Sequence, residues 1–510
     1  MQSGRILRLG ALVASCLASA PAAAMVDSSS ILFADETVRQ YKISFYDTNW
    51  KTTLEAYWNA DSGYLPARFS DGSITLDSVG VRYKGNSSFS LSGNSVKKPF
   101  KIKFGEFKDQ TYYGVKILNF SNGIGDPSFL REKISYDVLA HYFPTPRASF
   151  ATIAVNDTAI GLYTQVEQAD KVFLKRFYPN AKGTLFKAGD DGAPLVWMGT
   201  DTSRYDSLYE LKTNEDAHDY SGLMALVKAM GPDSATFCAE HRKWIDPDNV
   251  TKLLAFNMVF SNFDSYTGSG RNYYLYQVAD TAGVIGSRLE FIPWDVNLSF
   301  GAYTNNWNVL TQDLLTLGNA ANRPLIRRVN ECDSLRWAYL YWVKTIIGEY
   351  GGTAYIQSEI DRLAPIIRAH VAADVNKFYT AAAFETNLTA NFKNGPTATI
   401  PGLIAFSKAR DSILLAQVAT YLPANYARTS VQRSIALPTV RLRRFGDQWI
   451  LSGLESLGDY RIEWFHVSGR RLGSRIGHGS GAQILPLPAG MTLVRVISSQ
   501  GIRNLTVPNL

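Results

Sequence analysis

The composition of this chain changes near residue 430, and the change separates two segments that require different folds. The last lysine of the 510-residue sequence is Lys408, whereas residues 431–510 hold ten arginines, four acidic residues and no lysine. Within that last segment, short runs of alternating apolar and polar residues, such as 460–464 and 493–497, are separated by turns that contain glycine. Alternation with a period of two is typical of strands that bury one face. Residues 431–510 are therefore predicted to form a small all-β sandwich.

Residues 25–430 mix the patterns of strands and helices, which predicts an α+β fold for this larger domain. Alternating residues at 78–83 and 100–104 indicate strands within 25–120. An apolar stripe that includes Ile134 and Val138 predicts a helix over 126–143, with Asp126 as its cap. Further strands are expected at 148–167 and 272–300, and further helices at 167–178, 219–262 and 325–425.

Residues 1–24 have the composition of a secretory signal peptide. Arg5 and Arg8 give a positive start, an apolar stretch follows, and three alanines at 22–24 fit a small-residue cleavage site. The apolar stretch is too short to span a bilayer, and no later stretch is long and apolar enough to do so. A second interpretation is a lipoprotein, with lipid attached to Cys16. Either way, the protein is expected to be secreted or held at the surface of a bacterium.

Cysteine, histidine and charge usage limit the classes of partner. Cys238 and Cys332 remain after cleavage at residue 24, and they form either a disulfide or two buried thiols. The six histidines show no clustered ligand spacing, which argues against a structural zinc site. The formal net charge of +7 lies in the two ends of the chain, so residues 25–430 are nearly neutral. This distribution argues against a nucleic-acid partner.

One region carries the strongest chemical signal, because three oxygen-bearing side chains stand at the ends of expected elements. Asp264 follows an apolar helix, Asn272 begins a strand, and Asp295 ends another strand. Two carboxylates and an amide that converge on one cleft would suit Mg²⁺ or Mn²⁺, which in turn holds phosphates. The alternative is local: Asp264 caps a turn and Asp295 accepts bonds from nearby backbone N–H groups.

A lysine and a glutamate upstream give a second signal. Phe100, Ile102 and Phe104 share one face of an expected strand, and Lys98 has the same parity. A lysine on a buried face needs an anionic partner or ligand. Glu167 stands where a strand gives way to a helix, and it could pair with Lys98. Alternatively, Lys98 is solvated and Glu167 is an acid in the first turn of a helix.

Several short blocks, taken in order, resemble the CotH kinase family, and the resemblance covers about residues 40–415. The blocks are Arg-Tyr-Lys-Gly-Asn-Ser-Ser at 82–88, Lys-Lys-Pro-Phe-Lys-Ile-Lys-Phe at 97–104, Asp-Pro-Ser-Phe-Leu-Arg-Glu-Lys at 126–133, Val-Asn at 155–156, Gly-Leu-Tyr at 161–163, Leu-Phe-Lys at 185–187, Tyr-Glu-Leu-Lys-Thr-Asn-Glu at 209–215, Ser-Asn-Phe-Asp-Ser-Tyr at 261–266 and Pro-Trp-Asp-Val-Asn-Leu-Ser-Phe-Gly at 293–301. The resemblance implies an atypical protein-kinase-like fold over residues 25–430. It also implies transfer of phosphate from ATP, with Mg²⁺ or Mn²⁺, to Ser or Thr of secreted or surface proteins.

The resemblance assigns a role to each candidate residue. Asp264 matches the catalytic acid, while Asn272 and Asp295 match the metal ligands. The phosphate lysine and its partner are matched by Lys98 and Glu167, and two further nucleotide contacts are expected from Arg82 and Lys187. The match departs from ordinary kinases: Asn-Phe precedes Asp264 where His-Arg is usual, Asn272 stands eight positions after Asp264, and Val-Asn follows Asp295. These departures leave the individual roles open.

The tail resembles the C-terminal sorting domains of the type IX secretion pathway, through residues 464–472 and the Pro-Ala-Gly at 488–490. A contact with secretion machinery is implied, although a generic accessory sandwich fits the same pattern. Two functions compete with phosphoryl transfer. The first is a non-catalytic surface scaffold with the same fold, since ATP is scarce outside the cell. The second is a glycosidase that uses Asp264 and Asp295 as its carboxyl pair.

A chain that ends near Ser430 is expected to fold and to keep the chemistry of the larger domain, because no candidate site residue lies in 431–510. Its destination is expected to change, with the protein retained in the cell. Thermal melting and the fraction of protein at the cell surface measure the two outcomes. A truncated protein that still reaches the surface contradicts the sorting interpretation, and one that cannot fold shows that the tail belongs to the larger domain.

Overall fold

The computed structural model describes residues 28–35, 37–178, 180–232, 234–280, 283–316, 322–395 and 398–426, and in the tail 441–445, 448–452, 454, 459–466, 471–478, 483–485, 491–498 and 501–506. The expected signal segment, including Cys16, lies outside these residues. Two compact units are distinguished: a body, Ser28–Val431, and a second unit that contains Gln432–Leu510. Helices and strands are both abundant in the body, so the α+β prediction is confirmed.

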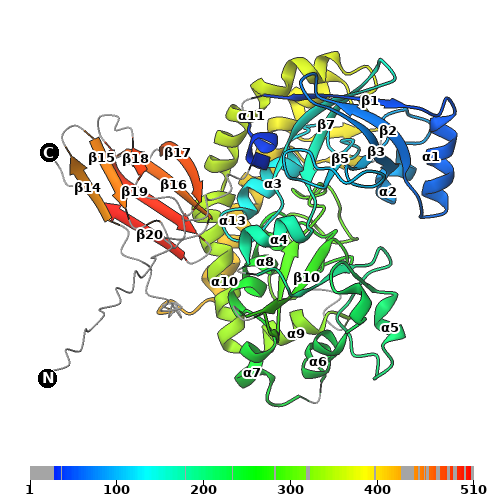
Figure 1. The fold of residues 1–510 in the computed structure, drawn as a ribbon. Coiled ribbons are helices and arrows are strands. Elements are labelled where there is room, and N and C mark those ends of the chain that lie inside the picture. The colour runs from blue at the N-terminus through cyan, green and yellow to red at the C-terminus, as the bar shows by residue number, and fades with distance from the viewer. Residues whose placement is uncertain are drawn as a thin grey trace, which may run out of the picture. The chain divides into compact units, whose positions relative to one another are not determined.

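The first half of the body is a closed seven-stranded barrel (Figure 1). Around the barrel the strands follow the order β1 (Arg39–Phe45), β2 (Leu65–Ser70), β3 (Thr75–Tyr83), β4 (Phe100–Lys103), β5 (Ile117–Ser121), β7 (Thr158–Glu167) and β6 (Ala148–Val155). A parallel pairing of β1 with β6 closes it, with Ile43 beside Val155. The interior is one apolar cluster in which Val81, Phe100 and Ile102 have no exposed surface. Closure leaves no free edge, so the face that remains for function is the outer one.

A second sheet, in the order β11-β10-β8-β9, follows in the middle of the body. Its strands are β8 (Thr184–Ala188), β9 (Tyr209–Leu211), β10 (Tyr273–Ala279) and β11 (Ile285–Pro293). The short helices around the barrel and this sheet are α1 (Trp50–Asn59), α2 (Ser87–Leu91), α4 (Lys171–Phe177), α5 (Ser203–Asp206), α6 (Ser221–Ala229) and α7 (Phe237–Glu240). All pairings in the sheet are antiparallel, so the end of β11 and the start of β10 lie together, with Tyr273 opposite Pro293.

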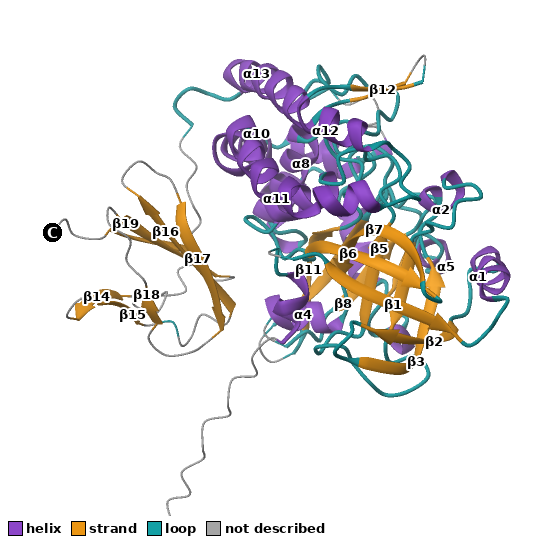
Figure 2. Ribbon diagram, turned by 90° about the horizontal axis from the view of Figure 1, so that it is seen from above, coloured by secondary structure: helices purple, strands orange, loops and turns teal. Residues whose placement is uncertain are grey.

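A further group of helices completes the body, and Figure 2 shows α10, α11, α12 and α13 grouped to one side of the barrel strands. The helices are α3 (Arg131–Leu139), α8 (Pro247–Val259), α9 (Pro324–Glu331), α10 (Asp333–Ile346), α11 (Thr353–Ala373), α12 (Ala381–Thr389) and α13 (Leu403–Tyr421), with a hairpin of β12 (Phe392–Asn394) and β13 (Ala398–Ile400). A buried ion pair joins the barrel to this group: Lys97 Nζ lies 2.5 Å from Asp374 Oδ2, and neither side chain is exposed. The Asp374 carboxylate also accepts a bond from the Leu162 N–H. Because an unpaired charge would be costly here, this contact fixes how the barrel meets α11.

Three expected elements differ in detail from the structure. The region 25–120 contains the helix α1 in addition to strands. Helix α3 begins at Arg131, because the Asp126 carboxylate accepts bonds from the backbone N–H groups of Ser128 and Arg131 and holds 126–130 as a turn. The expected helix at 167–178 begins later, with Asp170 as the cap whose carboxylate accepts bonds from two N–H groups of α4.

In the second unit, the described residues form two antiparallel sheets. One contains β14 (Arg441–Phe445), β15 (Gln448–Ser452) and β18 (Gln483–Leu485); the other contains β17 (Arg471–His478), β16 (Asp459–His466), β19 (Met491–Ser498) and β20 (Gly501–Thr506). In β16, Tyr460, Ile462 and Trp464 are buried, and so is Glu463 between the last two. The apolar residues keep the period of two that the sequence displays, whereas the buried Glu463 departs from it.

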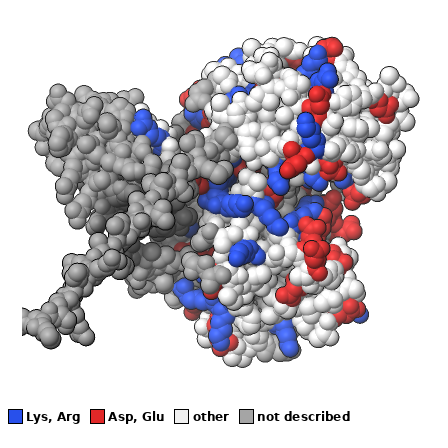
Figure 3. All heavy atoms as spheres, in the orientation of Figure 1, with Lys and Arg blue, Asp and Glu red and all other residues white. Residues whose placement is uncertain are grey.

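Among the described residues, no helix combines the length and the apolar character needed to cross a bilayer. Cys238 and Cys332 form a disulfide, with Cα atoms 5.3 Å apart, which settles the two alternatives left by the sequence. The bond closes a loop over a sequence separation of 94 residues. On the face seen in Figure 3, basic and acidic side chains of the body lie close to one another.

Replacing both cysteines with serine is expected to lower the free energy of unfolding by about 2–5 kcal/mol, because the unfolded chain regains the freedom that the loop had lost. Thermal or denaturant unfolding with and without a reductant measures the effect. Reductant should lower the melting temperature of the unmodified protein and leave the double variant unchanged. Equal melting temperatures for oxidised and reduced unmodified protein contradict the stabilising role.

Candidate functional site

Asp264 follows α8, and contacts at both ends hold this helix in place. At its start, the Asp246 carboxylate accepts bonds from two backbone N–H groups, and Pro247 occupies the first turn. Asn249 exchanges two hydrogen bonds with the backbone of Phe291 in β11, at 2.7 and 2.9 Å. At the other end, the buried guanidinium of Arg410 donates two bonds to the Met258 carbonyl. The cation therefore compensates the carbonyl end of the helix just before Asp264.

The loop between Asp264 and Asn272 is fixed by a buried arginine. Arg323 Nε donates to the Tyr266 carbonyl at 2.9 Å, and its Nη2 donates to the Gly268 carbonyl at 2.7 Å. Added bulk at Gly270 would collide with this guanidinium, since a Cβ there would lie 2.7 Å from Nη2. The carbonyls of Tyr266 and Gly268 are thus bonded, and the loop holds Asp264 and Asn272 in one arrangement.

Asn272 and Asp295 both have a left-handed backbone, with φ of 58° and 50°. Residues other than glycine rarely adopt this backbone conformation, and contacts with neighbouring residues must stabilise it where it occurs. Asn272 Nδ2 donates to the Asp264 carbonyl at 2.8 Å, and the Asp295 N–H donates to the Tyr136 hydroxyl at 3.0 Å. The structure thus brings Asp264, Asn272 and Asp295 together. Helix α3 also contacts this cluster, because its Tyr136 hydroxyl accepts the bond from Asp295.

The carboxyl groups in this cluster disfavour one another's charge. Burial raises the pKa of Asp264, and the nearby Asp295 carboxylate raises it further. One turn before Tyr136, Glu132 is 4% exposed. Burial and the Asp295 charge raise the pKa of Glu132 to about 8, although Lys84 opposes the shift. A site with this excess of carboxylates attracts a cation or a proton.

Basic side chains form a second cluster, centred on Lys101 on the outer face of the barrel. Burial lowers the pKa of Lys101 to about 7, and the charges of Lys212, Lys187, Arg82 and Lys84 add to the shift. Arg82 is directly opposite Lys101 across β3 and β4, whereas Lys187 belongs to β8 of the second sheet. Cations gathered from two sheets around a partly buried lysine attract a multiply charged anion.

Lys84 stands between the two clusters. Its charge acts on Lys101 in the basic cluster and on Glu132 in the acidic one, and its Nζ lies 6.0 Å from the centre of the Trp294 ring. Trp294 immediately precedes Asp295. The acidic and basic clusters are therefore two sides of one site, between the barrel and the second sheet.

The expected pairing of Lys98 with Glu167 is wrong in this structure. Lys98 Nζ donates to the carbonyls of Phe89 and Gly93, at 3.2 and 2.6 Å, and so closes the loop that contains α2. Glu167 is held instead by Arg147 and Arg176, whose nitrogens lie 2.8 and 2.9 Å from its oxygens. Burial alone would raise the pKa of Glu167, but these two arginines hold it below its ordinary value.

Sequence reasoning missed the central residue of the basic cluster, Lys101, and the buried acid Glu132. Lys101 has the parity opposite to the barrel core, which normally means solvent, but here side chains of the second sheet reach that face. Glu132 reads as an ordinary acid in a helix, and its neighbours Arg131 and Lys133 are charged as well. A signal was available, because a helix with three consecutive charges inside an apolar stripe must direct at least one of them inward.

The acidic cluster has the donor chemistry for a hard divalent cation. Carboxylates from Asp264, Asp295 and Glu132, with the amide oxygen of Asn272, are the ligand types that Mg²⁺ and Mn²⁺ prefer. As they stand, no three His, Cys, Asp or Glu side chains within the described ranges are spaced to enclose a metal ion. Such a site would need a ligand from solution, such as a phosphate, to complete its coordination.

Replacing Lys101 with methionine is expected to stabilise the protein by about 1–2 kcal/mol below pH 7. The folded-state pKa of Lys101 is depressed, so between about pH 7 and 10.5 the folded protein binds fewer protons than the unfolded chain. The cost of burying this ammonium is complete below pH 7 and is relieved as the pH rises. The gain from Lys101→Met should therefore shrink toward pH 10.

Urea unfolding at pH 6, 8 and 10 measures this gain. Lys103→Met is the matched control, because Lys103 lies two residues along the same strand and its ammonium pairs with Glu106 at 2.6 Å. A gain that stays constant with pH contradicts the burial of a charged Lys101.

Comparison with known proteins places the chain in a family. A family model described as "CotH kinase protein" matches residues 81–411, a range that contains all the residues of both clusters. Inner spore coat protein H of Bacillus subtilis (strain 168) is 27% identical over 267 residues, which is 51% of this chain and 68% of that protein. The family match covers more than half of the sequence, and this chain belongs to the CotH kinase protein family.

Proposed function

We propose that this protein is an atypical kinase that transfers the γ-phosphoryl group of ATP to Ser or Thr of secreted or surface proteins. The observation that carries the proposal is the pair of facing clusters, with Lys101, Lys187 and Arg82 on one side and the three carboxyl groups on the other. A phosphate chain with a bound divalent cation would neutralise both clusters at once, because the anionic phosphates would face the basic cluster and the cation would face the carboxyl groups.

Within this proposal the basic cluster binds the phosphates. Lys101 is the central contact, because it is the most desolvated of these cations and an anion beside it would restore its charge. Arg82 and Lys187 flank it from β3 and β8. Asp295, Asn272 and Glu132 would hold Mg²⁺ or Mn²⁺, which when bound neutralises charge on the phosphates.

Asp264 is proposed to act on the acceptor. Its raised pKa makes the carboxylate a better base than an exposed aspartate, and the fixed loop holds it in one position. The acceptor hydroxyl would give its proton to Asp264 as its oxygen bonds to the γ-phosphorus, while the bond to the β,γ-bridging oxygen breaks and ADP leaves. The reaction needs little else from the protein beyond positioning and compensation of charge.

The kinase-like fold and the cellular setting are part of the same proposal. The family match supports the fold, and the name of the relative, an inner spore coat protein, supports action in a surface layer. The described sheets of the second unit are compatible with a domain that contacts secretion machinery. The signal segment and the sorting role remain predictions from the sequence.

A scaffold without catalysis is the second candidate, and one observation favours it: in the described part of the chain, no three acidic or other ligating side chains enclose a metal position. The electrostatic repulsion within the two clusters argues against a scaffold. A scaffold has no use for carboxyl groups that raise one another's pKa or for a lysine whose pKa is lowered to about 7.

Asp264→Asn is expected to lower phosphate transfer to a Ser/Thr-rich acceptor by about 10²–10⁴-fold, because the variant keeps the shape and loses the base. Asp295→Asn should weaken metal-dependent ATP binding more than Asp264→Asn does, because Asp295 faces the phosphates. Transfer from labelled ATP and titration calorimetry with Mg²⁺ measure the two effects.

Asp157→Asn is the matched control, since Asp157 is exposed and also has a left-handed φ, of 67°. All variants are compared at equal folded concentration, checked by thermal melting. If Asp264→Asn transfers phosphate at the unmodified rate, the catalytic assignment is wrong and the scaffold is the better interpretation.

A further inference from the structure

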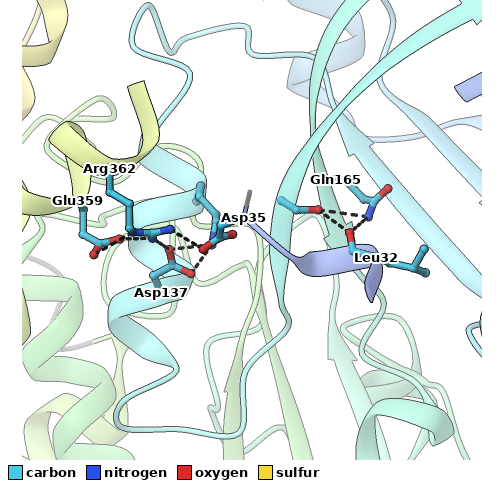
Figure 4. Close-up of polar contacts among 8 residues, drawn as sticks. Leu32, Asp35, Asp137, Gln165, Glu359 and Arg362 are labelled. Atoms are coloured by element: carbon cyan, nitrogen blue, oxygen red, sulfur yellow. Dashed lines mark hydrogen bonds and ion pairs between the residues drawn. The ribbon is translucent and has the colours of Figure 1, made fainter. Parts of the chain in front are cut away.

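The segment from Ser28 to Asp35 precedes the barrel and lies ahead of the family match at 81–411. It forms a short 3₁₀ helix, η1 (Ser28–Phe33), in which Leu32 has no exposed surface and Phe33 is 8% exposed. The Leu32 carbonyl accepts bonds from Gln165 Nε2 at 2.9 Å and from Ser149 Oγ at 3.0 Å, both on the barrel (Figure 4). The segment is thus docked by both apolar and polar contacts.

Arginine contacts add to this docking. Arg147 Nη2 donates to Ser29 Oγ at 2.7 Å, and its guanidinium lies 4.5 Å from the centre of the Phe33 ring. Glu167 orients Arg147 by accepting bonds from its Nε and Nη2. Glu167, which the sequence assigned to the nucleotide, therefore serves the attachment of this segment.

Asp35 ends the segment in a network of ion pairs with α3 and α11. Its carboxylate lies 2.9 Å from Lys133 Nζ and 2.5 Å from Arg362 Nη1. Lys133 Nζ and Arg362 Nη2 also reach Asp137, at 2.6 and 3.1 Å, and Glu359 contacts Arg362. In Figure 4, Asp137 of α3 and Asp35 of the N-terminal segment both contact the guanidinium of Arg362.

Helix α3 connects this network to the candidate site. Lys133 and Asp137 are four residues apart and lie on one face of the helix, while Glu132 and Tyr136 are four residues apart on a neighbouring face. The second face lies beside Asp295. The Asp295 N–H donates to the Tyr136 hydroxyl at 3.0 Å, and the Asp295 carboxylate acts on Glu132 through its charge. Any rotation or sliding of α3 would therefore move Glu132 relative to Asp295.

Asp35 supplies part of what keeps Lys133 charged in the interior. Lys133 is 3% exposed. Its ammonium lies 2.6 Å from Asp137 Oδ1 and 2.9 Å from Asp35 Oδ1, so both carboxylates compensate the buried charge. Without Asp35, the buried ammonium keeps one carboxylate partner, and Arg362 loses its tie to the segment. Loss of one partner from a buried pair favours movement of the helix toward solvent.

We propose that Asp35 is a positioning residue, through which the docked segment 28–35 sets the placement of α3 and so of Glu132 beside Asp295. The effect on phosphate transfer rests on the function proposed above, whereas the effect on α3 does not. Displacement of a site residue by about 1 Å can lower a rate by about 10²-fold, so a contact outside the site is sufficient to control it.

The test uses three variants in the full chain. Asp35→Asn removes the charge, Asp35→Glu retains it, and Asp77→Asn is the matched control, because Asp77 pairs with Arg68 at 2.6 Å on the exposed surface of the barrel. Hydrogen–deuterium exchange of the peptide that covers 131–139 is measured without nucleotide. We expect about 10-fold or faster exchange in Asp35→Asn, with normal exchange in Asp35→Glu and in the control.

A second measurement asks whether the effect passes through Glu132. Affinity for Mg²⁺–ATP is measured for Asp35→Asn, Glu132→Gln and the double variant. We expect Asp35→Asn to weaken binding about 10-fold, and to weaken it little further when Glu132 is already replaced. If Asp35 had a merely structural role, Asp35→Asn would weaken Mg²⁺–ATP binding by the same factor in the unmodified protein and in Glu132→Gln.

The outcomes separate the two proposals. Unchanged exchange in 131–139 for Asp35→Asn overturns the positioning role, whatever the activity. Additive losses in the double variant overturn the route through Glu132. If the unmodified protein binds no nucleotide while exchange in α3 responds to Asp35 as expected, the proposed function fails and the structural coupling stands.

Discussion

The body of this protein is organised around three consecutive charged residues that are all buried in α3. Arg131, Glu132 and Lys133 are 0%, 4% and 3% exposed, and successive residues of a helix point about 100° apart. Each side chain therefore meets a different neighbour, and only the two cations are compensated by acidic partners in the protein, since burial and Asp295 disfavour the charge of Glu132. Arg131 meets Asp126 and Asn387, Glu132 meets the candidate site, and Lys133 meets Asp35 and Asp137. The helical group, the site and the N-terminal segment are thereby fixed to one short helix.

The packing of the barrel explains why the site lies between two sheets. A closed barrel consumes its interior, so its functional groups stand on the outside, where Arg82 and Lys101 face cations from the second sheet. Cations gather on one side and carboxyl groups on the other, and compensation within the protein is partial: Arg82 pairs with Asp61, but burial and neighbouring like charges still shift the pKa values of Lys101 and Glu132. A ligand that carries both positive and negative charge would complement both sides.

The sequence predicts the α+β class and the meeting of Asp264 with Asn272 and Asp295, because element ends can be recognised from local patterns. The Lys98–Glu167 pair fails for a physical reason. Parity shows which face a residue occupies, but it does not show that carbonyls of the α2 loop satisfy Lys98 or that two arginines, distant in sequence from each other, satisfy Glu167. Lys101 and Glu132 were missed because their burial arises from tertiary contacts between barrel, sheet and α3. The roles of all these residues in catalysis remain predictions.

The disulfide between Cys238 and Cys332 brackets Asp264, Asn272 and Asp295 within one covalent ring. Val284 and Ile285, at the start of β11, are 65% and 40% exposed and lie inside the same ring. A protease that severed the chain there would leave two fragments that remain joined, with all three side chains retained on the linked pieces. This ring makes a single backbone cut survivable and makes reduction the step that separates the pieces.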